Sequence, residues 1–149
     1  MNAKRFPPND PKEWFNRAKS NLLQACSKPE GVYFEDLCFN AQQAAEKAIK
    51  SVLIHKEIHF PYIHDLTKLL SLLEQRGEGI PKPIKHAARL TRYAVVTRYP
   101  GFSEPISPHE YKEAIIIAKA VIRWAETVIQ GQTTLFAAPS RMRKKRTKS

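Results

Sequence analysis

The stretch from Tyr33 to Lys56 constrains the fold more than any other part of this 149-residue chain. It contains no Gly or Pro and is rich in strong helix formers. On a helix, its apolar side chains recur every three or four positions and share one face. These positions are Phe34, Leu37, Cys38, Ala41, Ala45, Ala48 and Val52. At about 1.5 Å per residue the helix spans roughly 35 Å, so we predict that it is the central helix of a small helical bundle.

The segment before this helix carries a clear helix start. Asp10 can cap a helix, Pro11 suits the first helical position, and Glu13 completes a capping-box pattern. The Lys-Pro-Glu-Gly sequence at 28–31 then ends the helix. Residues 1–9 contain two adjacent prolines, which oppose helix, so we predict an extended lead-in there.

Three more helices are predicted after the central one. The first runs from His64–Asp65 to Gly77, and the second from about Ile84 to Thr97. The third begins with a Ser cap at Ser107 and ends near Gly131; its apolar face is wider than one stripe, which indicates burial on several sides or contact with a partner. We therefore expect residues 10–131 to form an all-α, antiparallel up-and-down bundle of about five helices.

The net charge of +11 is spread unevenly along the chain. Residues 132–149 are predicted to be a disordered tail that holds six basic residues and no acid after Ala138, which leaves +5 for the rest. The basic residues are Arg141, Arg143, Lys144, Lys145, Arg146 and Lys148. Such a tail can bind nucleic acid non-specifically, or an acidic protein, or it serves only as a solubilising extension. Residues 132–136 are similar to short peptides that dock on DNA sliding clamps, and otherwise form an apolar segment that folds back on the bundle.

Other classes of protein are disfavoured by the composition. The two cysteines, Cys26 and Cys38, lie on apolar faces of predicted helices, so we expect buried free thiols and no disulfide. His55 and His59 are four apart, but no carboxylate follows to complete a metal site, and no metal is expected. The sequence shows neither a signal peptide nor an apolar run long enough to span a membrane, so a cytoplasmic protein without membrane contact is expected.

Four motifs occur in an order typical of one family. They are CFNAQQAAEKAIKSVL at 38–53, His-Asp-Leu at 64–66, YAVVTRYPG at 93–101, and an Ala-rich last helix with Trp124. Over about residues 12–130 the chain resembles the HEPN domain, a small helical nucleotide-binding domain. The resemblance implies a bundle that forms homodimers. It also implies a partner, a minimal nucleotidyltransferase, in a toxin–antitoxin-like module.

Some relatives in this family are metal-independent RNases. They carry an Arg followed, after four to six residues, by a His. No Arg in this chain has a His at that distance, since ten residues separate Arg98 from His109. We therefore predict no catalytic residues and a binding protein more than an enzyme. The alternatives are an RNase toxin that pairs Arg98 with a His from elsewhere in the fold, and a nucleic-acid-binding protein that acts through its tail alone.

Two groups of residues are candidates for binding a nucleotide, the only cofactor we expect. Arg98 can grip phosphate and Tyr99 can stack on a base, or the two can cap and pack at a helix end. Gln43, Lys47 and Lys50 share one face of the central helix and could hold a phosphate and a base edge. Otherwise that face is solvated, with Glu46 and Lys50 as an ion pair, or forms a polar dimer seam. His64 and Asp65 could form an acid–base pair, but neighbouring side chains on a helix diverge, so we expect them to cap the helix instead.

Overall fold

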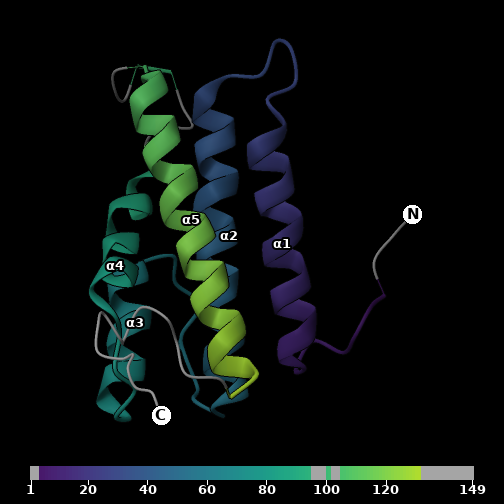
Figure 1. The fold of residues 1–149 in the computed structure, drawn as a ribbon, viewed down its shortest axis with the longest axis vertical. Coiled ribbons are helices and arrows are strands. Elements are labelled where there is room, and N and C mark those ends of the chain that lie inside the picture. Colours follow the sequence, from purple (N-terminus) through teal and green to yellow (C-terminus); the bar gives the residue numbers. More distant parts are fainter. Residues whose placement is uncertain (1–3, 95–99, 102–104, 132–149) are drawn as a thin grey trace, which may run out of the picture.

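The helices of the bundle are shown in Figure 1, drawn from a computed structural model that describes residues 4–94, 100–101 and 105–131. The described residues contain helices and no strand. In chain order the elements are α1 (Pro11–Ser27), α2 (Phe34–His55), α3 (Leu66–Gln75), α4 (Lys82–Lys85), the 3-10 helix η1 (His86–Ala94) and α5 (Pro108–Ile129). The predicted all-α bundle of five helices is confirmed.

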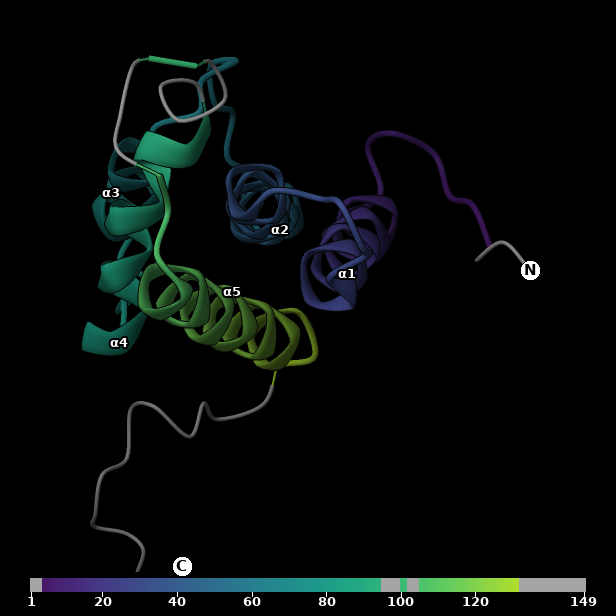
Figure 2. The same ribbon diagram turned by 90° about the horizontal axis from the view of Figure 1, so that it is seen from above.

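Helix α2 lies at the centre of the bundle, between α1 on one side and α3, α4 and η1 on the other (Figure 2). Helix α1 runs antiparallel to α2, since a short turn connects them. Helix α5 lies against α2 and runs in the same direction, because α3, α4 and η1 return the chain to the end where α2 begins (Figure 1). The rings of Phe34 and Tyr111, at the starts of α2 and α5, accordingly stack with their centroids 4.9 Å apart.

The core confirms the central role of α2. Its alanines at 41, 44, 45 and 48 are fully buried, as are Ile49, Val52 and Leu53. Small side chains let the neighbouring helices approach closely, while the branched ones fill the space between them. The predicted apolar face therefore does pack into the core, and only Phe34 on that face is half-buried.

Side-chain caps fix where three helices begin. Asp10 accepts a hydrogen bond from the backbone of Lys12, and Asp65 accepts one from Lys68, at 2.9 and 3.3 Å. Ser107 forms a complete capping box with Glu110. The predicted capping-box role of Glu13 is wrong. Its carboxylate instead accepts from the backbone of Phe6 and from two arginines, while the backbone N–H of Asp10 donates to the carbonyl of Pro7.

The segment predicted as a single helix from Ile84 to Thr97 differs in the structure. A short α4 passes into η1, which ends at Ala94, and residues 95–97 lie outside the described part of the chain. The 3-10 geometry has three residues per turn, so side chains three apart lie in line. Ala87, Leu90 and Tyr93 are spaced in this way and are all buried. The spacing of these apolar residues therefore suits the 3-10 winding, and it fits an α-helical face as well.

Two further predictions about burial have different outcomes. Cys38 is buried, and burial above all raises the pKa of its thiol to about 12, so that it stays protonated. The prediction for Cys26 is wrong, because it is exposed. It follows the buried Ala25 by one position, and one position turns a helix by about 100° away from the core.

The wide apolar face of α5 is explained mostly by burial within one chain. Ile117 and Trp124 both lie in the core, and Tyr111 donates a hydrogen bond from its hydroxyl to the carbonyl of Ala25, 2.6 Å away on α1. Ile116 is the large apolar side chain of α5 that stays exposed. Of the two alternatives left open by the sequence, burial on several sides therefore accounts for most of this face.

Candidate functional site

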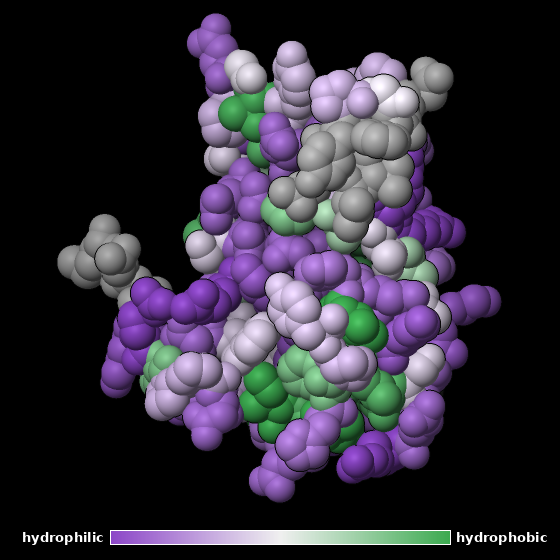
Figure 3. Space-filling model, turned by 180° about the vertical axis from the view of Figure 1, so that it is seen from behind, coloured by the Kyte–Doolittle hydropathy of each residue, from purple (hydrophilic) through white to green (hydrophobic). Residues whose placement is uncertain are grey.

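A polar cleft of about 590 Å³ lies between the lead-in, α1, α2 and the segment before α3. Its lining residues are Arg5, Phe6, Pro8, Glu13, Trp14, Arg17, Gln43, Glu46, Lys47, Lys50, Tyr62 and His64. Four cationic side chains and two carboxylates line it, an excess of two positive charges before His64 is counted. From behind the view of Figure 1, hydrophilic residues cover much of the surface, and hydrophobic ones gather low on it (Figure 3).

Glu46 is a buried carboxylate on the α2 side of the cleft. Its Oε1 atom accepts from Gln42 at 2.8 Å and lies 3.0 Å from Nδ1 of His64, while Oε2 lies 2.6 Å from Nζ of Lys50. Burial tends to raise the pKa of Glu46, but the hydrogen bonds from Lys50, Gln42 and His64 outweigh it and hold that pKa below its ordinary value. Glu46 is therefore a charged anchor whose oxygens are fully engaged by protein donors.

Lys50 is buried with its partner. The side chains of Lys50 and Glu46 are only 2% and 4% exposed. The ammonium of Lys50 also lies 5.2 Å from the ring centroid of Tyr62 and 5.7 Å from that of Phe60, within the range of cation–π attraction. The i,i+4 ion pair expected from the sequence is thus confirmed. The alternative of a solvated face does not hold for this pair, because Phe60 and Tyr62 pack against Lys50, whereas Gln43 and Lys47 on the same face are half-buried.

Lys47 differs from Lys50 in its partners. Its Nζ donates to the neutral amide oxygen of Asn21 at 2.9 Å, and no carboxylate among the described residues pairs with it. Burial lowers the pKa of Lys47, the nearby charges of Arg17 and Lys50 lower it further, and Glu46 opposes the change. Lys47 is therefore a half-buried cation on the cleft wall, in a place that favours the arrival of an anion.

The rim on the α1 side is organised by Glu13. Its carboxylate accepts from the backbone of Phe6 at 2.8 Å, from Arg17 at 2.7 Å and from Arg5 at 3.2 Å. The bond from Phe6 is the main cause that lowers the pKa of Glu13 to about 2, and Arg17 adds to it. This carboxylate ties the lead-in to α1, and it positions Arg17 beside Lys47.

Two aromatic rings, those of Trp14 and Tyr62, line the cleft. Trp14 donates from its indole nitrogen to the carbonyl of Pro8 at 2.6 Å, which fixes its ring against the lead-in. Tyr62 is 87% exposed, and its ring meets that of His64 edge-on at 5.6 Å. An exposed aromatic face beside cations can stack on a nucleobase while the cations bind phosphate.

The sequence predicted part of this arrangement. Gln43, Lys47 and Lys50 are indeed brought together on one cleft, with Gln43 donating to Gln42 at 2.8 Å. Arg98 and Tyr99 lie outside the described residues, and so do the basic residues of the tail and the segment 132–136.

Trp14 and Arg17 were not predicted to belong to a site. They lie four and seven residues after Asp10, at the start of a predicted helix, but this spacing alone does not show that α1 faces α2. Asp65 is a cap, as expected, whereas His64 turns to Glu46. The described residues contain no group of three or more His, Cys, Asp or Glu placed to hold a metal ion.

The fold and the cleft define a small helical-bundle protein with a cationic, aromatic-rimmed binding cleft between its first two helices. The HEPN domain profile matches residues 11–128, and the chain belongs to the HEPN domain family. Among the helices described, none combines the length and the apolar character that a bilayer span requires.

Two solved structures share the fold. TT1696 from Thermus thermophilus is 30% identical, with a TM-score of 0.69 over 80% of this chain and 98% of that one. ST0689, described as an archaeal HEPN homologue, is 27% identical, with a TM-score of 0.64 over 85% of this chain and 99% of that one. No curated protein matches the chain significantly.

Proposed function

We propose that this protein is a nucleotide-binding HEPN protein that holds the phosphates of its ligand in the cleft between α1 and α2. The observation that carries the proposal is the state of Lys47, a half-buried cation without a carboxylate partner among the described residues. An anion that accepts from Lys47 forms a hydrogen bond in which both partners are charged, in a partly desolvated site. Such a bond is stronger than the one that Lys47 now makes to Asn21.

The residues around Lys47 suit a phosphate group with a base attached. Arg17 lies beside Lys47, and its planar guanidinium can bind two phosphate oxygens at once. Tyr62 offers an exposed ring in the lining of the same cleft, on which a base can stack. The cleft volume of about 590 Å³ falls within the range of small-molecule sites. Gln43, half-buried beside these residues, can read a base edge.

Assembly belongs to the same proposal and is supported by family membership. We propose that the protein forms a homodimer and that its partner is a minimal nucleotidyltransferase in a toxin–antitoxin-like module. A nucleotide bound at the α1–α2 cleft would then be available to the partner enzyme. Co-expression of the two proteins followed by size-exclusion chromatography tests this part, and separate elution at micromolar concentration would contradict it.

Isothermal titration calorimetry tests nucleotide binding directly. ATP and inorganic triphosphate should bind to the full chain, while adenosine should bind far more weakly. Lys47→Met should weaken ATP binding by about 10- to 100-fold, since a hydrogen bond to a charged group contributes about 1.5–3 kcal/mol. The matched control is Lys68→Met on α3, which changes an exposed lysine outside the cleft. It should leave the affinity unchanged.

The same samples distinguish the competing functions. Equal ATP affinity for Lys47→Met and the unaltered chain would show that the cleft is not the site. Cleavage of RNA without metal, abolished by Arg98→Ala, would favour the RNase alternative. Loss of duplex DNA binding when the chain is cut after Ala138, with ATP binding intact, would assign nucleic-acid binding to the tail.

A further inference from the structure

A second groove lies on a different face of the bundle, between the C-terminal half of α1 and the N-terminal half of α5. It has a volume of about 300 Å³ and shares no lining residue with the nucleotide cleft. Its lining residues are Cys26, Lys28, Tyr111, Lys112, Ile115, Ile116 and Lys119. Helix α1 packs closely on α2 and more sparsely on α5, which leaves this groove open to solvent.

One large aliphatic side chain of the groove lining is exposed, and a second exposed one lies on α1, three residues before the lining residue Cys26. Ile116 is 68% exposed on its α5 side, and Leu23 is 73% exposed on α1. Leu23 shares a helical face with Cys26, which lines the groove, because residues three apart on a helix are neighbours. Exposed aliphatic residues on two adjoining helices, beside a groove, are typical of a protein-binding surface.

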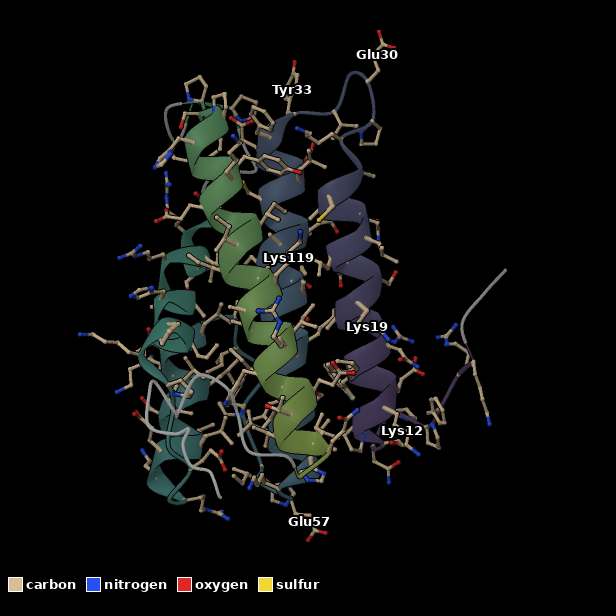
Figure 4. All side chains as sticks on the ribbon, in the orientation of Figure 1. Lys12, Lys19, Glu30, Tyr33, Glu57 and Lys119 are labelled. Carbon is tan, nitrogen blue, oxygen red and sulfur yellow. The ribbon has the colours of Figure 1, made fainter. Side chains whose placement is uncertain are left out.

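Lysines flank these aliphatic residues on both helices. Lys112 and Lys119 precede and follow Ile116 on one face of α5, and Lys19 stands one turn before Leu23 on α1. Lys19 on α1 and Lys119 on α5 lie on neighbouring helices, with Lys119 the higher of the two in Figure 4. Within the described part of the chain, none of these three lysines forms an ion pair, and no carboxylate lines the groove.

The positive charge of these lysines distinguishes between the molecules that could bind in the groove. A second copy of the chain related by a two-fold axis would bring the lysines of one groove against those of the other, and like charges in close contact destabilise an interface. The chain's own tail is also basic. Nucleic acid would meet the lysines but would leave Leu23 and Ile116 without an apolar contact, because it is bound through phosphates and base stacking.

We propose that the α1–α5 groove docks an acidic amphipathic helix of a partner protein. The apolar stripe of that helix covers Leu23 and Ile116, and acidic side chains on both borders of the stripe pair with Lys19, Lys112 and Lys119. The two outer lysines of α5 are seven residues apart, about two helical turns, so the partner should present its anchors at i, i+3 or i+4, and i+7. The inference does not depend on nucleotide binding in the other cleft.

The test uses a designed peptide helix of about five turns, with a leucine stripe flanked by glutamates and a fluorescent label. The control peptide keeps every leucine and replaces each glutamate with lysine. In fluorescence anisotropy, the acidic peptide should bind the full chain, and binding should weaken as salt is added because the ion pairs are screened. The basic peptide should bind at least tenfold more weakly.

Substitutions in the groove test whether the peptide binds there. Ile116→Asp and the pair Lys112→Glu with Lys119→Glu should each weaken the acidic peptide at least tenfold, and the charge-reversed pair should gain affinity for the basic peptide. All three positions are exposed, so folding should persist, which circular dichroism can verify. The matched control Lys82→Glu on α4 reverses a charge elsewhere, outside the groove, and should change nothing. ATP titration of the same variants gives an independent readout, since their nucleotide affinity should stay the same.

Several results would overturn the proposal. Absence of binding by the acidic peptide would reject it, and so would equal binding of both peptides. A homodimer that dissociates on Ile116→Asp would assign the groove to a second copy. DNA binding that is lost in the charge-reversed pair, without peptide binding, would assign it to nucleic acid.

Discussion

Removal of the charge of Glu46 should cost more stability than any other single change of a carboxylate described here. In Glu46→Gln the ammonium of Lys50 stays buried, with its side chain 2% exposed, and loses the carboxylate 2.6 Å away. An amide cannot neutralise that charge, and breaking a buried ion pair from one side costs about 3–5 kcal/mol. For a domain of this size we expect the melting temperature to fall by roughly 10–15 °C.

A urea titration followed by far-UV circular dichroism measures this loss. The matched control is Glu74→Gln, which removes one partner of an exposed pair with Lys85 at 3.2 Å. Surface ion pairs contribute about 0–1 kcal/mol, so the free energy of unfolding of the control should be close to that of the unaltered protein. The double variant Glu46→Met with Lys50→Met should be less destabilised than Glu46→Gln, because it leaves no unpaired charge in the interior.

A loss for Glu46→Gln as small as that of the Glu74→Gln control would refute this reasoning. It would mean that water reaches Lys50 and that the segment before α3 does not cover the pair. Greater destabilisation of the double variant than of Glu46→Gln would also refute it. The methionines would then have removed packing or hydrogen bonds worth more than the charge.

Three other substitutions test the fold. Glu13→Gln should loosen the lead-in and lower the free energy of unfolding. Because Glu13 has a pKa of about 2 against an ordinary 4.5, the stabilisation by its carboxylate is full above about pH 4.5 and is lost toward pH 2. The free energies of unfolding of the variant and the unaltered chain should therefore become equal in acid. Ser107→Ala should cost about 1 kcal/mol in urea, through loss of the α5 cap. Ala45→Leu should cost about 1–3 kcal/mol in the same assay, because the alanine is fully buried against a neighbouring helix.

Sequence periodicity predicted the bundle well because helix starts and core faces are local signals. The caps at Asp10 and Ser107 and the alanine face of α2 each follow from a few residues at fixed spacing. The change from α-helix in α4 to 3-10 helix in η1 was not predicted, because apolar residues three apart and four apart both fit a helical face. The exposure of Cys26 depends on a rotation of one position, which a pattern of apolar residues does not resolve.

The site was harder to predict because burial of charge is a tertiary property. A stripe of Gln, Glu and Lys on a helix is usually solvated, and no local pattern indicates that the Phe60–His64 segment covers Glu46 and Lys50. The contact between Lys47 and Asn21 joins residues 26 apart in the chain. Only the packing of α1 on α2 brings these two side chains into contact and places the arginine at position 17 beside them.

The cleft and the core meet on the same helix, so ligand binding should stabilise the whole domain. Helix α2 holds the buried alanines on one face and Lys47 on another. A ligand that binds only the folded state at 100 times its dissociation constant adds about 2.7 kcal/mol of stability. ATP at that concentration should therefore raise the melting temperature of the unaltered chain by several degrees. After a 10- to 100-fold loss of affinity, Lys47→Met keeps only about 0.4–1.4 kcal/mol of this stabilisation, so its melting temperature should rise by about half as much or less. An equal rise in both proteins would show that ATP binds elsewhere, because only a site that includes Lys47 makes the rise depend on this residue.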